Sequence, residues 1–152
     1  MSFYNTSIIK TKLGYFSLTT VNNYIISYYP SNTNIIKVNS NIIHKIFLKK
    51  IEMYLIKKTA LLNFKVKQDG TLFQQSVWKE INKIRYGKTK TYLDIAKNLN
   101  SSPRAVGRAC AQNGCLIIIP CHRVIHSDGE IGDYVLGKKT KEYLNKLKQK
   151  KI

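Results

Sequence analysis

The chain has 152 residues, of which 43% are hydrophobic and 11% are aromatic. At about 100–200 residues per domain, this length allows one domain or two small ones and excludes a large multidomain machine. Lysine and arginine number 26 against 8 aspartates and glutamates, a net charge of +18. This excess is spread along the chain and favours a polyanionic partner, nucleic acid first and an anionic membrane second; a basic surface that only confers solubility is the alternative.

The sequence also bears on the compartment. No apolar run approaches the ~18–20 residues that span a bilayer, and no signal-sequence pattern is present at the N-terminus. The cysteines, Cys110, Cys115 and Cys121, are odd in number and lie close together, which makes a poor disulfide framework. We therefore expect a reducing compartment, the cytoplasm, and no membrane association.

The first part of the chain, residues 1–61, predicts a sheet covered by a helix. Residues 1–37 alternate apolar and polar positions between turn-forming residues, and Asn22-Asn23 suits a tight hairpin. From residue 40 to residue 58, apolar residues recur at spacings of three and four, which predicts an amphipathic helix. We expect a small antiparallel sheet with one helix.

The second part, residues 62–152, predicts mostly helices, so the fold class is α+β. A helix is expected between Thr71 and Gly87, with Phe73, Val77, Trp78, Ile81 and Ile84 on one face. Thr91 and Asp94 form a capping-box variant that opens a helix through Leu99. Ser102 and Pro103 can start another helix, which is expected to end near Asn113-Gly114 in a left-handed turn.

The helix that starts at Thr91 and the helix that starts at Ser102, joined at Asn100-Ser101, form a helix-turn-helix candidate. Arg104 and Arg108 lie four apart and so share one face of the second helix. Four further residues are small enough for close approach to a duplex: Ala105, Val106, Gly107 and Ala109. Helix pairs with short turns also occur in proteins that never bind DNA, but with the charge excess DNA is the leading partner.

A cysteine and a histidine follow this helix pair. The apolar run from Leu116 to Ile119 predicts a buried strand that delivers Cys121 just past Pro120, with His122 beside it. A thiol with a pKa of ~8.5 needs a base or a cationic environment, and adjacent helical side chains diverge by ~100°, which favours proton transfer through a water. The alternatives are a buried inert thiol and a core histidine. A zinc site fits poorly, because no Cys-x-x-Cys pair is present.

The segment from Pro120 to Val124, Pro-Cys-His-Arg-Val, resembles the active-site signature of the O6-alkylguanine-DNA alkyltransferases, the methylated-DNA–protein-cysteine methyltransferase family. The likeness continues in order through Phe73–Trp78, Gly87, Thr91-Tyr92 with Ile95-Ala96, Ser102–Gly107, Asn113, and Gly132–Tyr134 with Gly137. Ordered motifs over half the chain are specific. The first sixty residues agree with the family only in size and in sheet-plus-helix character.

The resemblance implies direct repair of double-stranded DNA that carries O6-alkylguanine, with O4-alkylthymine as a further candidate. The base is flipped out of the duplex, and the alkyl group is transferred irreversibly to Cys121 in a single turnover. His122 would be the water-mediated base, and Tyr92 would help to rotate the nucleotide and donate a proton toward guanine N3. We expect a monomer without a cofactor or a metal.

The resemblance also implies roles for the remaining candidate residues. Arg104 would fill the gap left by the flipped base, and the DNA-binding surface would further comprise Ser102, Ala105, Gly107 and Arg108. Asn113 would be the hinge before the Cys121 segment. The pocket would use the backbone oxygens of Cys121 and Val124, the Tyr134 side chain, the N–H of Val135, and Lys141.

The chain departs from the family pattern in the last helix. Lys148 stands where a glutamate usually orients the histidine, and the nearest acid, Glu142, is ~240° out of phase on a helix. Smaller departures from the family pattern occur at Arg85, Gly114 and Val135. Some members of the family have an N-terminal zinc site, but this chain has no cysteine before Cys110 that could form it.

A non-catalytic binder of alkylated DNA is the alternative function, but such alkyltransferase-like proteins lack the acceptor cysteine. A cysteine hydrolase would need a separate histidine and an orienting Asn or Asp.

Overall fold

The computed structural model describes residues 3–147, which form two compact units. The first unit consists of the chain up to Gln68 together with Gly114–Ile118, and the second consists of Asp69–Asn113 and the chain from Ile119 onward. The first unit extends past the expected boundary at Leu61 because the following segment bonds to a sheet strand: Lys67 N donates to Ile25 O at 2.8 Å. Within residues 3–147, no helix is long and apolar enough to cross a membrane.

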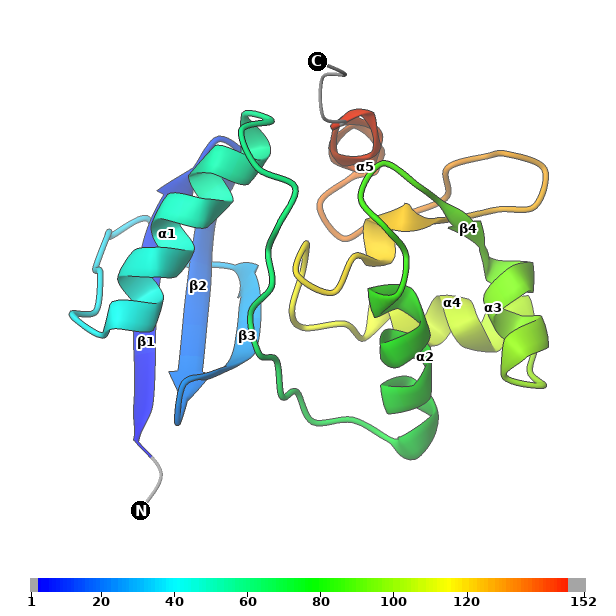
Figure 1. Cartoon of the computed structure of the whole chain (residues 1–152), viewed down its shortest axis with the longest axis horizontal. Helices are drawn as coiled ribbons and strands as arrows, with labels where there is room; N and C mark the ends of the chain where they lie inside the picture. The colour runs from blue at the N-terminus through cyan, green and yellow to red at the C-terminus, as the bar shows by residue number, and fades with distance from the viewer. Residues whose placement is uncertain (1–2, 148–152) are drawn as a thin grey trace. The chain divides into compact units, whose positions relative to one another are not determined.

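The first unit is the predicted three-stranded antiparallel sheet with one covering helix (Figure 1). Its strands are β1 (Tyr4–Thr11), β2 (Gly14–Val21) and β3 (Tyr24–Pro30), and its helix is α1 (Ile42–Leu55). Asn22 and Asn23 both adopt positive φ, 49° and 67°, as a two-residue hairpin turn requires. The sheet and the helix predicted from the sequence are confirmed.

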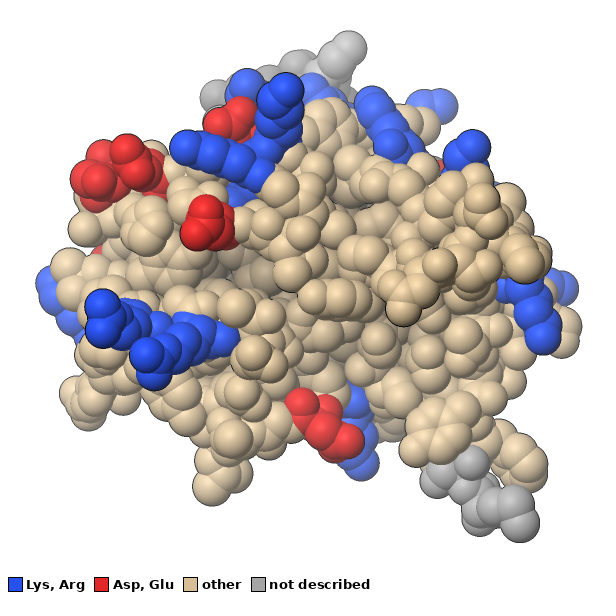
Figure 2. Space-filling model, turned by 180° about the vertical axis from the view of Figure 1, so that it is seen from behind, with Lys and Arg blue, Asp and Glu red and all other residues tan. Residues whose placement is uncertain are grey.

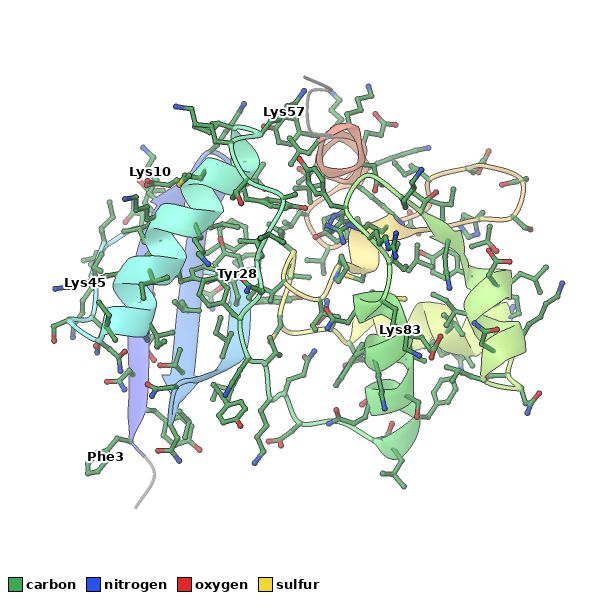
Figure 3. All side chains as sticks on the ribbon, in the orientation of Figure 1. Phe3, Lys10, Tyr28, Lys45, Lys57 and Lys83 are labelled. Carbon is green, nitrogen blue, oxygen red and sulfur yellow. The ribbon has the colours of Figure 1, made fainter. Side chains whose placement is uncertain are left out.

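Aromatic side chains fill the core of this unit. Tyr28 is fully buried and stacks on Phe16, with 4.9 Å between ring centroids, and it meets Phe47 of α1 edge-on at 4.8 Å. Tyr28 points into the interior, whereas the labelled lysines Lys10 and Lys45 point outward (Figure 3). Alternation along the strands therefore sends one face to the core and the other to solvent.

The second unit is mainly helical. Its elements are α2 (Leu72–Asn82), β4 (Lys90–Thr91), α3 (Tyr92–Asn98), α4 (Pro103–Ala111), the 3-10 helix η1 (Cys121–Arg123), β5 (Val124–Ile125) and α5 (Lys138–Lys146). The expected capping box is present: Thr91 Oγ1 accepts from Asp94 N, and Asp94 accepts from Thr91 N. Ser102 caps α4 and Pro103 is its first residue. These confirm the predicted starts of α3 and α4.

Four expectations about this part of the chain were wrong. Helix α2 ends at Asn82, so Ile84 lies in the turn before Gly87. Helix α4 does not end in the expected left-handed turn, because neither Asn113 nor Gly114 has positive φ. A left-handed residue instead follows α3, at Asn100, with φ 51°. The apolar run Leu116–Ile119 is buried but is not a strand, because Ile117 has a φ of 71°. Val106 and Ala109 do not offer a DNA-facing surface, since both are buried.

Gly70, in the segment before α2, leaves no room for a larger side chain. A Cβ added at Gly70 would lie 2.6 Å from the Trp78 indole, and Trp78 cannot easily yield because its Nε1 donates to Ala109 O at 2.9 Å. We expect Gly70→Ala to lower the free energy of unfolding by about 1–3 kcal/mol, measured by denaturant titration. The matched control is Gly107→Ala, whose Cβ meets nothing closer than 4.0 Å inside α4. It should be stabilising by about 0.5–1 kcal/mol, and equal effects of the two substitutions would contradict this account.

Candidate active site

The helix-turn-helix is formed by α3 and α4 and carries the predicted basic face. Arg104 and Arg108 are both exposed, and Ser102, also exposed, caps α4 through Ala105 N at 3.2 Å. Ala105 and Gly107 are half-buried. On the face of the molecule drawn in Figure 2, the basic side chains form separate groups, and acidic side chains lie beside several of them. The structure thus presents the two arginines on one helix that also offers small residues.

Cys121 begins the η1 turn and is nearly buried, with 5% of its surface exposed. The buried amide of Asn113, just after α4, donates through Nδ2 to Ile119 O at 2.9 Å and to Cys121 Sγ at 3.3 Å. The same side chain therefore holds the segment before the cysteine and contacts the thiol directly.

The surroundings of Cys121 act on its ionisation in opposite directions. Burial raises the pKa of the thiol, because the thiolate loses its hydration. The Asn113 hydrogen bond, the Lys141 charge and the backbone N–H groups of Cys121 and His122 act to lower that pKa. Cys110 and Cys115 are also free thiols, and burial raises the pKa of each to about 12. Cys121 differs in accepting a hydrogen bond from the Asn113 side chain, which acts against the effect of burial.

His122 is fully buried, and within residues 3–147 neither of its ring nitrogens has a hydrogen-bond partner. Burial, then the charges of Arg123 and Lys141, hold the pKa of His122 well below its usual range, so the ring is neutral near pH 7. No direct hydrogen bond joins His122 to the Cys121 thiol, as expected for neighbours that diverge by ~120° on a 3-10 turn. Lys148, where a carboxylate was expected, lies outside the described residues.

Lys141 and Tyr92 form a second polar group in this unit. The buried Lys141 donates through Nζ to Tyr92 Oη and to Asp133 O, each at 3.3 Å. Burial raises the pKa of Tyr92 and lowers that of Lys141. Since the Tyr92 oxygen accepts from Lys141, its own proton remains available for donation. His126 lies against Tyr92, with 5.0 Å between ring centroids.

The other predicted pocket residues differ from one another in how deeply they are buried. Tyr134 is half-buried, with its ring centroid 6.3 Å from that of His122. Val124 is completely buried in β5, and Val135 is 51% exposed.

Two residues of the site were not predicted from the sequence. His126 lies beside Tyr92, and Asn145 donates through Nδ2 to His122 O at 2.7 Å. Neither belongs to a motif, so no local signal marks them. Within residues 3–147 no group of three metal-ligating side chains occurs.

Because His122 is buried and neutral, the free energy of unfolding should depend on pH. Its pKa is lowered in the folded state, so below about pH 6.5 the unfolded chain binds more protons and folding is weakened as the pH falls. Between pH 7.5 and pH 5, we expect the free energy of unfolding to fall by about 2 kcal/mol more in the wild type than in His122→Gln. Denaturant titrations at both pH values measure this difference.

His126→Gln is the matched control for that experiment, because His126 is exposed in the same unit. It should retain the acid sensitivity of the wild type. His44, the other buried histidine, also has a pKa lowered by burial, which is why variants are compared rather than the wild type alone. Identical acid sensitivity of His122→Gln and the wild type would show that His122 is not a buried neutral group.

Fold and site together define an α+β protein in which one unit holds both a helix-turn-helix and a buried, hydrogen-bonded cysteine. The family model described as 6-O-methylguanine DNA methyltransferase, DNA binding domain, matches residues 72–150. A methylated-DNA–protein-cysteine methyltransferase of Methanosarcina barkeri is 42% identical over 106 residues, which are 68% of this chain and 67% of that protein. The chain belongs to the O6-methylguanine-DNA methyltransferase family.

Solved structures agree with this assignment. The crystal structure of Mycobacterium tuberculosis O6-methylguanine methyltransferase superposes with a TM-score of 0.82 at 25% identity, covering 95% of this chain and 92% of that chain. The crystal structure of Mycobacterium tuberculosis OGT in complex with DNA gives a TM-score of 0.81 at 27% identity, covering 95% and 91%. The likeness spans the first unit too, where the sequence resembles the family only in general character.

Proposed function

We propose that this protein repairs DNA by direct damage reversal, as a single-turnover methylated-DNA–protein-cysteine methyltransferase. The Cys121 thiolate attacks the alkyl carbon of O6-alkylguanine, a C–S bond forms, and the C–O6 bond breaks with its electrons going to guanine. The observation that carries this proposal is the thiol itself: Cys121 is present, nearly buried, and hydrogen-bonded by Asn113. A binder that only holds the lesion would have no use for this acceptor.

The site residues divide the proton transfers between them. The Cys121 proton passes through a water to the neutral His122 ring. The Tyr92 hydroxyl, which accepts from Lys141, donates toward guanine N3 so that guanine leaves as a neutral base. The proton taken from the thiol is thus balanced by the proton given to guanine, and the reaction as written needs no cofactor.

The exposed face of α4 supplies the DNA contacts of this proposal. Arg104 occupies the gap left by the flipped base, while Arg108 and Ser102 bind phosphates and Ala105 and Gly107 lie in the minor groove.

The flipped guanine lies between Tyr134 and the turn. There the backbone oxygens of Cys121 and Val124 accept from its amine, and Val135 N–H donates to O6. Asn113 is the hinge between the helix pair and the turn. The protein acts as a monomer on double-stranded DNA.

A stoichiometric titration tests this function. With excess O6-methylguanine duplex, we expect one lesion to be removed per protein molecule, after which removal stops, because the thioether product is stable. Chromatographic analysis of the remaining O6-methylguanine gives the count. Full retention of the lesion despite tight binding would favour the non-catalytic binder.

DNA binding should depend steeply on salt. Lysine and arginine contacts release counterions, so the logarithm of the association constant should fall linearly with the logarithm of salt concentration, by a slope of roughly −0.9 for each phosphate contacted. Fluorescence anisotropy with labelled duplexes of different sequence, measured over a salt series, checks this. A slope near zero would remove DNA from the list of partners.

A further inference from the structure

A side-chain hydrogen bond ties the last turn of α5 to the active-site turn. Asn145 Nδ2 donates to the backbone oxygen of His122 at 2.7 Å. Leu144 and Asn145 lie three and four residues after Lys141, and Lys141 and Leu144 are buried, so these side chains share one face of α5. Helix α5 packs on Cys121–Arg123, and the hydrogen bond to His122 O places Asn145 on the side of the helix that faces this turn.

The His122 oxygen is an acceptor that η1 itself does not use. Within this turn, Arg123 N donates to Pro120 O and Val124 N donates to Cys121 O. The His122 oxygen therefore falls at the C-terminal end, where the carbonyls of a helix lack an internal partner. Asn145 satisfies this carbonyl and fixes the main chain on the C-terminal side of the cysteine, as Asn113 fixes it on the N-terminal side.

Within the described residues, the His122 ring has no orienting hydrogen bond of its own, whereas its backbone oxygen has one. The ring is fully buried, and within residues 3–147 no group hydrogen-bonds to Nδ1 or Nε2, so no carboxylate orients it there. The charged groups that face it, Arg123 and Lys141, are both positive. The Asn145 amide bonds to the backbone oxygen of His122 without adding a charge beside the ring.

We propose that Asn145 is the positioning residue of His122, acting through the His122 backbone oxygen in place of a carboxylate on the ring. The inference rests on the proposed function, in which His122 accepts the thiol proton. Asn145 itself does not touch the reacting atoms.

The kinetic test compares four proteins with free O6-benzylguanine as the alkyl donor, which removes DNA binding from the measurement. Asn145→Leu deletes the donor and should slow transfer about tenfold at pH 7.5. Asn145→Gln keeps an amide and should stay within about threefold of the wild type. Asn98→Leu is the matched control, because Asn98 is an exposed asparagine of α3 with only a long contact to Glu80, and it should react at the wild-type rate.

Asn145→Asp supplies a readout that a merely structural role would not move. The carboxylate is nearly the same size as the amide but repels the His122 oxygen and places a negative charge beside the ring. It should raise the pKa of His122, so the loss of rate on the acid side should begin at a higher pH than in the wild type. An unchanged pH profile in Asn145→Asp, or a wild-type rate in folded Asn145→Leu, would overturn the proposal.

A spectroscopic measurement keeps the test independent of activity and of the proposed function. Long-range nitrogen–proton NMR spectra report the tautomer and pKa of His122 in each variant. Both should change in Asn145→Leu and Asn145→Asp but not in Asn98→Leu, and unchanged His122 signals would also overturn the proposal. If the wild type transfers no alkyl group from free O6-benzylguanine or from the O6-methylguanine duplex, the proposed function fails. The NMR spectra then still decide the role of Asn145.

Discussion

Replacing Cys121 with alanine is expected to abolish alkyl transfer while leaving the affinity for an O6-alkylguanine duplex largely intact. The variant removes the sulfur that we propose as the alkyl acceptor, whereas phosphate contacts, which are expected to supply most of the affinity, remain. Transfer is followed with a radiolabelled methyl group in the duplex, and affinity is measured by fluorescence anisotropy.

Cys110→Ala is the matched control for this substitution. Cys110 is a buried free thiol of the same unit, but the Asn113 amide donates to Cys121 and not to Cys110. Transfer should therefore persist in Cys110→Ala. Sustained transfer in Cys121→Ala, or its loss in Cys110→Ala, would assign the acceptor to the wrong cysteine.

Arg104→Ala is expected to slow transfer from a duplex by about two orders of magnitude while leaving transfer from free O6-benzylguanine unchanged. Flipping a base costs a few kcal/mol of unstacking, and the side chain that fills the vacated gap offsets part of that cost. A free base needs no flipping, so the two substrates separate this role from the chemistry. Single-turnover rates with both substrates provide the measurement.

Arg108→Ala tests whether the effect is specific to Arg104. Both arginines are exposed on α4, four residues apart, so each variant removes one charge from the same helix face. Arg108→Ala should weaken binding to all duplexes alike and lower the salt slope by about one. If both arginine variants reduce duplex transfer equally, or if free-base transfer falls in Arg104→Ala, the role assigned to Arg104 is wrong.

The parts of the fold that sequence predicts are those governed by local chemistry. The Asn22-Asn23 pair tolerates left-handed backbone and so marks the hairpin, and both residues have positive φ. Thr91 and Ser102 mark helix starts because their hydroxyl oxygens accept from backbone N–H groups three residues on. The helix-turn-helix followed from these signals.

Features set by distant contacts were not predictable in this way. The parallel pairing of β4 with β5 joins two-residue strands more than thirty positions apart, too short to show a pattern. The sequence shows that Val106 and Ala109 are small, which suggested close approach to DNA. It does not show that both side chains are buried. Asn145 reaches His122 across 23 positions, and nothing in the spacing of the two residues indicates that contact.

Intact-mass spectrometry of the protein after mixing with an O6-methylguanine duplex shows whether Cys121 accepts the alkyl group. We expect the whole protein to gain the mass of one methyl group, peptide mapping to place this group on Cys121, and a duplex with unmodified guanine to produce no change. An unchanged mass after incubation with excess alkylated duplex, or a methyl group located on any residue other than Cys121, would contradict this expectation.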